Sequence, residues 1–321
     1  MYKTVVIGAR GHTGAELLPL LLRHPDFELI AVGSGSAAGQ SVSTHIKGME
    51  GCDLEFADIH PRDLGQIPAD ACVLALPNGA AARYVEVLDQ LRPATVVVDL
   101  SADHRFDPAW AYGQPERFAT DLVGARRIAN PGCYATAAQL ALAPLAGELV
   151  GMPAAFGVSG YSGAGTTPSR RNDPEVLEDN LLPYTLVDHV HETEVSHHLG
   201  HDIRFLPHVA PFFRGISLTV AAELLNPKTE RDLLTLFRDY YAGCPLVEVR
   251  ASIPEVKEVR GRHLAIVGGF AVSEAHPRRV SLVSVLDNLL KGAATQAVQN
   301  LNLAFGLDPM AGLDVGRGAR Q

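Results

Sequence analysis

The first 130 residues alternate short apolar runs with segments of helical spacing. The apolar runs are rich in β-branched residues and almost free of polar positions, which is typical of strands covered on both faces of a parallel sheet. Strands are expected at Lys3–Ile7, Phe27–Val32, Ala71–Leu76, Thr95–Leu100 and Ile128–Ala129, with helices at Thr13–Arg23 and Ala80–Leu91. This alternation predicts an α/β domain with a parallel sheet.

Beyond this region the pattern changes, because apolar and polar residues alternate in the manner of antiparallel strands. Strands are expected at Ala155–Ser159, Ile216–Leu225, Leu246–Arg250, His263–Ser273 and Arg278–Leu286, and helices at Tyr134–Leu149, Lys228–Ala242 and Asp287–Phe305. Residues 166–200 are polar and are expected to be rich in loops. The chain is therefore expected to divide near Cys133 into a Rossmann-like α/β domain and an α+β domain with a mostly antiparallel sheet.

Composition narrows the class of protein. The chain has 321 residues, of which 47% are hydrophobic and 20% are charged, as in ordinary globular proteins. A net charge of −9 argues against nucleic acid or an anionic membrane as the main partner but leaves a small anionic substrate open. The first apolar run is too short for a signal peptide, no later run approaches a membrane span, and none of the four cysteines forms a Cys-x-x-Cys pair. A cytoplasmic protein with reduced thiols is expected.

A glycine-rich turn follows the first strand and opens the first helix. Glycines at 8, 11 and 14 let the backbone turn tightly and approach a pyrophosphate, whose charge then lies at the helix N-terminus. The spacing is G-x-x-G-x-x-G, so a plain strand-turn-helix connection remains the alternative. The residues expected to bind the nucleotide here are Gly8, Arg10, Gly11, His12, Thr13 and Gly14.

The end of the second strand indicates which nucleotide is bound. NAD-binding domains place a carboxylate there to hold the ribose hydroxyls, whereas this strand ends in Gly33-Ser34-Gly35-Ser36. A small hydroxylated loop leaves room for a 2′-phosphate, which Ser34, Ser36 and Arg10 are placed to contact. NADP(H) is therefore the expected cofactor, although the same serines and glycines also suit a simple flexible loop.

One of the four cysteines stands out. Cys133 follows Pro131-Gly132 and precedes a helical run, so the helix dipole favours its thiolate and a nucleophilic role. Cys72 lies in an apolar strand and is expected to pack in the core. A histidine is the expected proton carrier, and the densest candidate segment is residues 189–194, His-Val-His-Glu-Thr-Glu. Val195 breaks the His-Glu-x-x-His zinc pattern, so no metal is expected, and His197, His198 and His201 are interpreted as a solvated polar loop.

Five ordered blocks carry a family resemblance that no single block would establish. The blocks are Gly11-His12-Thr13-Gly14-Ala15-Glu16-Leu17, Asp99-Leu100-Ser101-Ala102-Asp103, Asn130-Pro131-Gly132-Cys133-Tyr134-Ala135-Thr136, Gly157-Val158-Ser159-Gly160-Tyr161-Ser162-Gly163-Ala164-Gly165 and Asp287-Asn288-Leu289-Leu290-Lys291-Gly292-Ala293. From about residue 3 to about residue 307 the chain resembles the N-acetyl-gamma-glutamyl-phosphate reductases, relatives of aspartate-semialdehyde dehydrogenase.

The resemblance implies roles for particular residues. Cys133 matches the family's nucleophile, His191 its general acid/base, and Glu194 the glutamate that orients the histidine. The family's His-Arg-His-Thr-Pro-Glu block departs here at residues 190, 192 and 193, and the choice of His191 over His189 rests on the match. The arginine that usually follows Ser-Gly-Ala-Gly is replaced by Thr166, with Arg170 and Arg171 soon after.

Further residues are assigned to the two ligands on the same basis. Pro77, Ser159, Gly160 and Asn288 are expected beside the cofactor, with Lys291 near them. The residues expected to bind substrate are Arg105, Arg214 and Asn130, although a cleft arginine equally suits a structural ion pair.

The resemblance also implies an architecture and a reaction. Residues 1–132 and 287–321 would form the NADP-binding domain, and residues 133–286 the catalytic and dimerisation domain of a homo-oligomer, dimeric or tetrameric. The implied reaction is NADPH-dependent reduction of N-acetyl-L-glutamyl 5-phosphate to the 5-semialdehyde, in arginine biosynthesis, through a Cys133 thioester. The alternatives are an aspartate-semialdehyde dehydrogenase, a reductase of carrier-protein-linked aminoadipyl phosphate in lysine biosynthesis, and a nucleotide-sensing module without catalysis.

Overall fold

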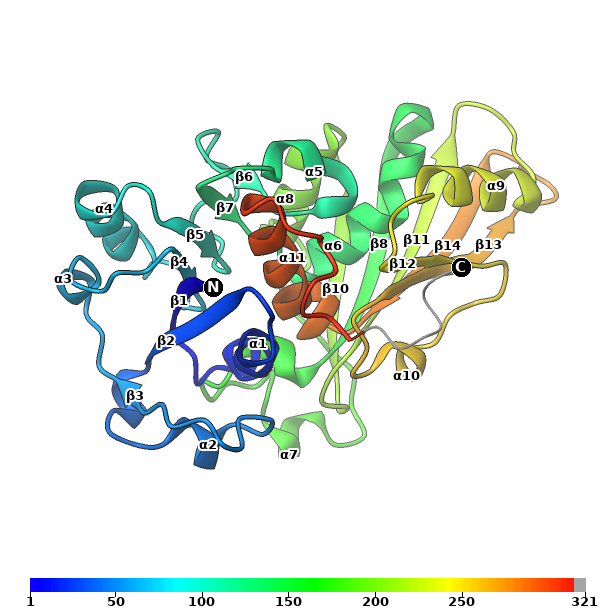
Figure 1. The fold of residues 1–321 in the computed structure, drawn as a ribbon. Helices are drawn as coiled ribbons and strands as arrows, with labels where there is room; N and C mark the ends of the chain where they lie inside the picture. Colours follow the sequence, from blue (N-terminus) through cyan, green and yellow to red (C-terminus); the bar gives the residue numbers. More distant parts are fainter. Residues whose placement is uncertain (315–321) are drawn as a thin grey trace. The chain divides into compact units, whose positions relative to one another are not determined.

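The computed structural model describes residues 1–314 (Figure 1), so residues 315–321, which we assigned to the nucleotide domain, lie outside the described part. The chain forms two compact units, Met1–Gly132 with Ala293–Asp314, and Cys133–Gly292. Residues 287–292, expected in the first unit, fold with the second. The reason is local, because the side chains of Asp287 and Asn288 bond to backbone amides of that unit.

The first unit contains a seven-stranded sheet of order β3-β2-β1-β4-β5-β7-β6. Its strands are β1 (Tyr2–Ile7), β2 (Phe27–Gly33), β3 (Phe56–Ala57), β4 (Ala71–Leu74), β5 (Val96–Asp99), β6 (Ala111–Tyr112) and β7 (Arg127–Ala129). All paired strands are parallel. The strand order reverses between β1 and β4, and ligands of such sheets bind where the strands end at this point. A ligand of this unit is therefore expected at the loops that follow β1, β4 and β5.

Helices and apolar side chains cover this sheet. The helices are α1 (His12–Leu22), α2 (Val42–His45), α3 (Pro61–Leu64), α4 (Ala82–Leu91), α5 (Pro115–Leu122) and α11 (Thr295–Ala304), with a 3-10 turn η1 at Gly35–Ala37. Every residue of β4 and β5 is buried, which explains their unbroken apolar sequence. Helix α11 contacts α1, α5 and β5, so the C-terminal helix completes the unit that the N-terminus begins (Figure 1).

The second unit contains a mixed seven-stranded sheet of order β12-β13-β14-β11-β8-β10-β9. Its strands are β8 (Leu149–Gly160), β9 (Leu182–Pro183), β10 (Arg204–Ala210), β11 (Ile216–Leu224), β12 (Val247–Val249), β13 (Ala265–Val272) and β14 (Arg279–Leu286). The central pairs β8–β11, β11–β14 and β14–β13 are antiparallel, as predicted. The pairs β8–β10 and β12–β13 are parallel. Strand β10 was not predicted from the sequence.

Helices pack against this sheet. They are α6 (Cys133–Leu142), α7 (Pro174–Leu177), α8 (Val190–Leu199), α9 (Glu230–Tyr240) and α10 (Val256–Val259), with 3-10 turns η2 (Ala143–Glu148) and η3 (Tyr161–Ala164). Helix α6 is buried along almost its whole length and contacts α8, β11 and β14. No helix in residues 1–314 is long and apolar enough to cross a lipid bilayer.

Two helices were not predicted correctly. Residues 166–200 are rich in loops, as expected, but they also contain the ten-residue helix α8. Its buried positions include Glu194 beside Val195 and Leu199, so the apolar periodicity that normally identifies a helix is interrupted. The continuous helix expected over 287–305 is instead a π-helical segment, η4 (Leu290–Ala294), followed by α11.

Candidate active site

The glycine turn after β1 has the backbone that a pyrophosphate cradle needs. Gly8 has φ +80°, and a Cβ on it would lie 2.2 Å from the carbonyl oxygen of Ala75. A Cβ on Gly14 would lie 2.4 Å from the carbonyl oxygen of Ala9. Both positions therefore require glycine for a close approach of two backbones. The turn leads directly into α1, where His12 is half-buried and burial lowers its pKa.

The loop after β2 holds a cation where NAD-binding domains hold a carboxylate. Arg10 Nη1 donates to Ser36 Oγ at 2.9 Å, which brings together two of the residues expected at a 2′-phosphate. Both side chains are exposed, whereas Ser34 is 9% exposed. The Arg10–Ser36 pair is thus the accessible part of the predicted contact set. Asp58 lies close to Gly35 but pairs with His60 at 3.3 Å.

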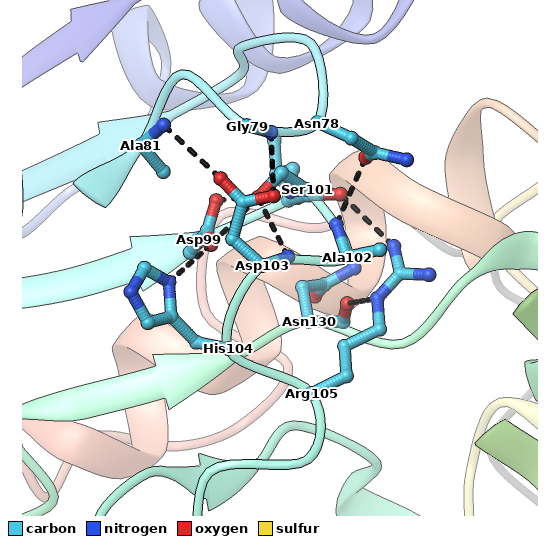
Figure 2. Close-up of polar contacts among 11 residues, drawn as sticks. Asn78, Gly79, Ala81, Asp99, Ser101, Ala102, Asp103, His104, Arg105 and Asn130 are labelled. Carbon is cyan, nitrogen blue, oxygen red and sulfur yellow. Dashed lines mark hydrogen bonds and ion pairs between the residues drawn. The ribbon is translucent and has the colours of Figure 1, made fainter.

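A polar network joins the loops that follow β4 and β5 (Figure 2). Asp103 accepts hydrogen bonds from the amides of Gly79 at 2.6 Å and Ala81 at 3.2 Å, and Asn78 Oδ1 accepts one from Ala102 at 3.0 Å. These bonds cross between the two loops in both directions. The turn that carries Pro77 is therefore held by the same loop that carries Arg105.

The β5 loop is stiffened from within by a buried carboxylate. Asp99 is fully buried, and its oxygens accept from Ser101 Oγ at 2.8 Å and contact His104 Nδ1 at 2.7 Å (Figure 2). The His104 ring also stacks on Trp110 at a centroid distance of 4.0 Å. His104 was not predicted from the sequence, although its place directly after the block Asp99–Asp103 was an available signal.

The guanidinium of Arg105, a predicted substrate-binding residue, donates hydrogen bonds to two backbone carbonyls. Its Nε donates to the carbonyl of Asn130 and its Nη2 to that of Leu100, each at 3.0 Å (Figure 2). The Asn130 side chain accepts from Asn300 Nδ2 on α11 at 3.0 Å and is 1% exposed. Both residues are thus built into the strand end that precedes the Cys133 segment.

Cys133 is the first residue of α6 and the most accessible residue of its first turn. The adjacent Tyr134 anchors that turn, because its hydroxyl donates to the carbonyl of His208 at 2.8 Å and its ring lies over Gly157, where a Cβ would come within 2.5 Å. Burial raises the pKa of Tyr134 well above its ordinary value. Its phenol thus stays neutral and donates, and Cys133 begins a fixed helix. By contrast, Cys72 is fully buried and burial raises its pKa to about 12, so it is an inert core thiol.

The histidine segment forms the start of α8. His189 is its N-cap, and His189 Nδ1 accepts the backbone N–H of His191 at 3.1 Å. Burial, reinforced by the charge of Arg171, lowers the pKa of His189 to about 4. His191 lies in the first turn, with its ring centroid 6.0 Å from that of Tyr134. Glu194 is one helical turn further on, on the same face, and is fully buried.

Other predicted residues of the second unit lie around the start of β11. Arg214 Nε is 2.6 Å from Asp287 Oδ2, which makes Arg214 an ion-pair partner, the alternative left open for it. Asn288 Oδ1 accepts from the amide of Gly215 at 2.7 Å, and its Nδ2 donates to Ser162 Oγ at 2.9 Å. Cofactor contact by Asn288 therefore stays a prediction.

The end of β8 is equally constrained. Ser159 is 3% exposed and donates to the carbonyl of Gly160 at 2.8 Å. A Cβ on Gly160 would lie 2.5 Å from the carbonyl oxygen of Phe213, so this position requires glycine. Both residues precede the 3-10 turn η3, which leads into the polar loop with Arg170 and Arg171.

Comparison with known proteins identifies this combination of units. The profile described as "Semialdehyde dehydrogenase, NAD binding domain" matches residues 3–125, and the one described as "Semialdehyde dehydrogenase, dimerisation domain" matches residues 133–288. The chain belongs to the semialdehyde dehydrogenase family. Its first unit is thus the family's NAD-binding type of domain, and its second unit carries the Cys133 and His191 segments of the same family.

Curated relatives and solved structures agree with this family. Proteins named N-acetyl-gamma-glutamyl-phosphate reductase from Xanthomonas campestris pv. campestris (strain B100) and Xylella fastidiosa (strain M23) are 50% and 51% identical over 308 residues. These alignments cover 96% of this chain and 97% and 94% of the relatives. Aspartate semialdehyde dehydrogenase II from Vibrio cholerae, solved with ASA, has a TM-score of 0.77 at 18% identity, covering 94% of this chain and 98% of that one. The enzyme from Candida albicans, solved with NADP, has a TM-score of 0.72 at 16% identity, covering 95% and 99%. The structural likeness establishes the fold.

Proposed function

We propose that the protein is an N-acetyl-gamma-glutamyl-phosphate reductase, which reduces N-acetyl-L-glutamyl 5-phosphate to the 5-semialdehyde and releases phosphate. The observation that carries this proposal is about 50% identity over 96% of the chain to proteins of that name. Further support is that the family-like segments lie in the glycine turn between β1 and α1 and at the starts of α6 and α8. We assign this reaction to arginine biosynthesis, and a biosynthetic role of this kind supports a cytoplasmic location.

Cys133 is the proposed nucleophile. Its place at the start of α6 lets the positive end of the helix dipole favour the thiolate. The thiolate attacks the acyl carbon, the bond from that carbon to the phosphate oxygen breaks, and a thioester remains. NADPH, when bound, supplies the hydride that reduces the thioester. Breakage of the carbon–sulfur bond then releases the aldehyde and restores Cys133.

His191 is the proposed proton carrier, in preference to His189. The Nδ1 of His189 is already an acceptor for the α8 backbone, and its pKa of about 4 keeps it neutral near pH 7. His191 is less buried and lies beside Tyr134, the neighbour of Cys133. Glu194, one turn along the same helix face, is the proposed orienting group.

NADP(H) is the proposed cofactor. The support is the Arg10–Ser36 pair at the end of β2, because a guanidinium with a hydroxyl suits a 2′-phosphate better than a ribose diol. We expect Arg10→Ala to raise the KM for NADPH about tenfold or more while leaving that for NADH nearly unchanged. An equal rise for both nucleotides would refute this role. The "dimerisation domain" description of the second unit supports a homo-oligomer.

A substrate panel with a matched nucleophile variant tests the function. N-acetylglutamate semialdehyde, aspartate semialdehyde and a carrier-linked aminoadipate semialdehyde are each offered with phosphate and NADP. We expect turnover of the first, and its loss in Cys133→Ser with NADP binding retained. The buried Cys72→Ser variant is the control for thiol loss. Turnover of another aldehyde would change the substrate, and an active Cys133→Ser would remove the thioester route.

A further inference from the structure

Arg171 lies on a loop that is held in place by its neighbour. Asn172 Nδ2 donates to the carbonyls of Gly165 and Thr167, each at 2.9 Å, and Asn172 Oδ1 accepts from the amide of Ser169 at 2.8 Å. The Asn172 side chain thus holds together the loop between η3 and α7. Arg171 therefore projects from a defined backbone, unlike a long side chain on a free surface loop.

The guanidinium of Arg171 lies beside the segments that hold the proposed catalytic residues. It is 5.0 Å from the ring centroid of Tyr184, within the range of cation–π attraction. The Tyr184 ring meets the His189 ring at 5.5 Å, and His189 caps the helix that carries His191. A short series of direct contacts thus leads from Arg171 to the first turn of α8.

The pKa of Tyr184 responds to charges on both Cys133 and Arg171. Burial, followed by the negative charge of Cys133, raises the pKa of Tyr184 to about 12, while the charge of Arg171 acts in the opposite direction. The thiol and the guanidinium therefore both act on one phenol ring. Tyr184 therefore stays neutral near pH 7.

Arg171 has no acidic partner among residues 1–314, although it is half-buried. Arg214, in the same unit, is matched with the buried carboxylate of Asp287. A partly desolvated guanidinium is favourable when it binds an anion, and its planar fork suits an anion with two oxygens in one plane. A guanidinium without a carboxylate partner, in contact with the ring that packs against His189, therefore suits an anion-binding site.

We propose that Arg171 binds the phosphate group of the acyl-phosphate substrate, and inorganic phosphate in the reverse reaction. This inference rests on the proposed function. The phosphate is preferred over the α-carboxylate because it is bonded to the carbon that Cys133 attacks, whereas the carboxylate lies at the other end of the carbon chain. Arg171 would hold the leaving group and stabilise its negative charge as the bond breaks.

Kinetics in the reverse direction tests this assignment. The KM for phosphate and the KM for N-acetylglutamate semialdehyde are measured separately for Arg171→Ala, Arg171→Lys and Arg170→Ala. Arg170 is the matched control because it is the exposed neighbour on the same loop. We expect Arg171→Ala to raise the KM for phosphate about tenfold to a hundredfold, Arg171→Lys to restore part of the loss, and Arg170→Ala to change neither constant by more than about twofold.

A measurement without turnover keeps the proposal testable if activity is lost. Inorganic phosphate should slow the alkylation of Cys133, followed by mass spectrometry, in the wild type and in Arg170→Ala but not in Arg171→Ala at the same phosphate concentration, and Arg171→Lys should be intermediate. An unchanged phosphate KM, or a rise confined to the semialdehyde KM, would overturn the assignment. If the wild type instead prefers another semialdehyde, the proposed substrate fails, and the same phosphate comparison with that aldehyde still decides the role of Arg171.

Discussion

Gly292 is the residue whose substitution most directly tests whether the position of Cys133 is fixed by the packing of the second unit. A Cβ on Gly292 would lie 2.8 Å from Cys133 Cβ, 3.1 Å from Leu286 Cδ1 and 3.3 Å from the carbonyl oxygen of Asp287. Carbon atoms pack at about 3.5–4.0 Å, so Gly292→Ala requires the two chain segments to separate by about 0.7–1.2 Å. The clash falls on the Cβ that carries the proposed nucleophilic sulfur.

The expected effect on catalysis exceeds the effect on stability. Overpacking of a well-packed core costs about 1–3 kcal/mol, which a protein of this size tolerates. A displacement of about 1 Å at a reacting group lowers the rate up to about a hundredfold. We therefore expect Gly292→Ala to lower kcat about tenfold to a hundredfold, with the thermal transition still cooperative.

The assay is kcat in both directions, with the alkylation rate of Cys133 and thermal unfolding followed on the same preparations. Gly147→Ala is the matched control, because a Cβ at Gly147 meets nothing within 4 Å and Gly147 also has an ordinary φ. A folded Gly292→Ala protein with kcat within about twofold of the wild type would show that Cys133 is not held by this contact.

Three further predictions follow from polar contacts of His189, Asp103 and Tyr134. The pKa of His189 falls from 6.5 to about 4 on folding, so the folded chain binds a proton less readily than the unfolded chain. The free energy of unfolding should therefore fall by on the order of 3 kcal/mol as the pH is lowered from about 6.5 to 4. His189→Asn keeps an N-cap acceptor, and its unfolding free energy should depend less on pH over this interval; equal slopes for both proteins would contradict the pKa. Asp103→Asn leaves one acceptor oxygen for the two amides that Asp103 now binds, so we expect the free energy of unfolding to fall by about 0.5–1.5 kcal/mol and the KM for NADPH to rise; if calorimetry shows the loss of stability but the KM for NADPH is unaltered, this loop does not act on the cofactor. Tyr134→Phe removes the donor to the His208 carbonyl and should lower unfolding free energy by about 1–2 kcal/mol with faster alkylation of Cys133; an unchanged alkylation rate would exclude Tyr134 as its anchor.

The sequence predicted well those elements in which buried residues recur at a single regular spacing. Strands β4 and β5 are buried at every position and β1 from Thr4 to Ile7, so their apolar runs identified them directly. The alternation over β11 and β14 reflects a sheet with differently exposed faces. Helix α8 was missed because Glu194 occupies one of its buried positions. A residue buried for its chemistry interrupts the pattern by which helices are recognised.

The candidate site was predicted in the same uneven way. The positions that require glycine could be predicted from the sequence. Gly8 and Gly14 lie where a side chain would collide with backbone atoms. The hydrogen-bond and ion-pair partners of long polar side chains could not be predicted, because these partners are distant in the sequence. Arg214 meets Asp287, 73 residues away, and Asn288 meets Ser162, 126 residues away. No spacing rule links such pairs.

The arginines show why residue type alone does not assign a ligand. Arg105 donates to two backbone carbonyls, and Arg214 is neutralised by a buried carboxylate. For a second anion, Arg214 would have to share its charge with Asp287, which weakens binding. Arg171 instead has an aromatic ring against its face and no carboxylate among the described residues, so its charge remains available to an anion. The partner that each guanidinium already has therefore ranks Arg171 above the two arginines that the sequence favoured.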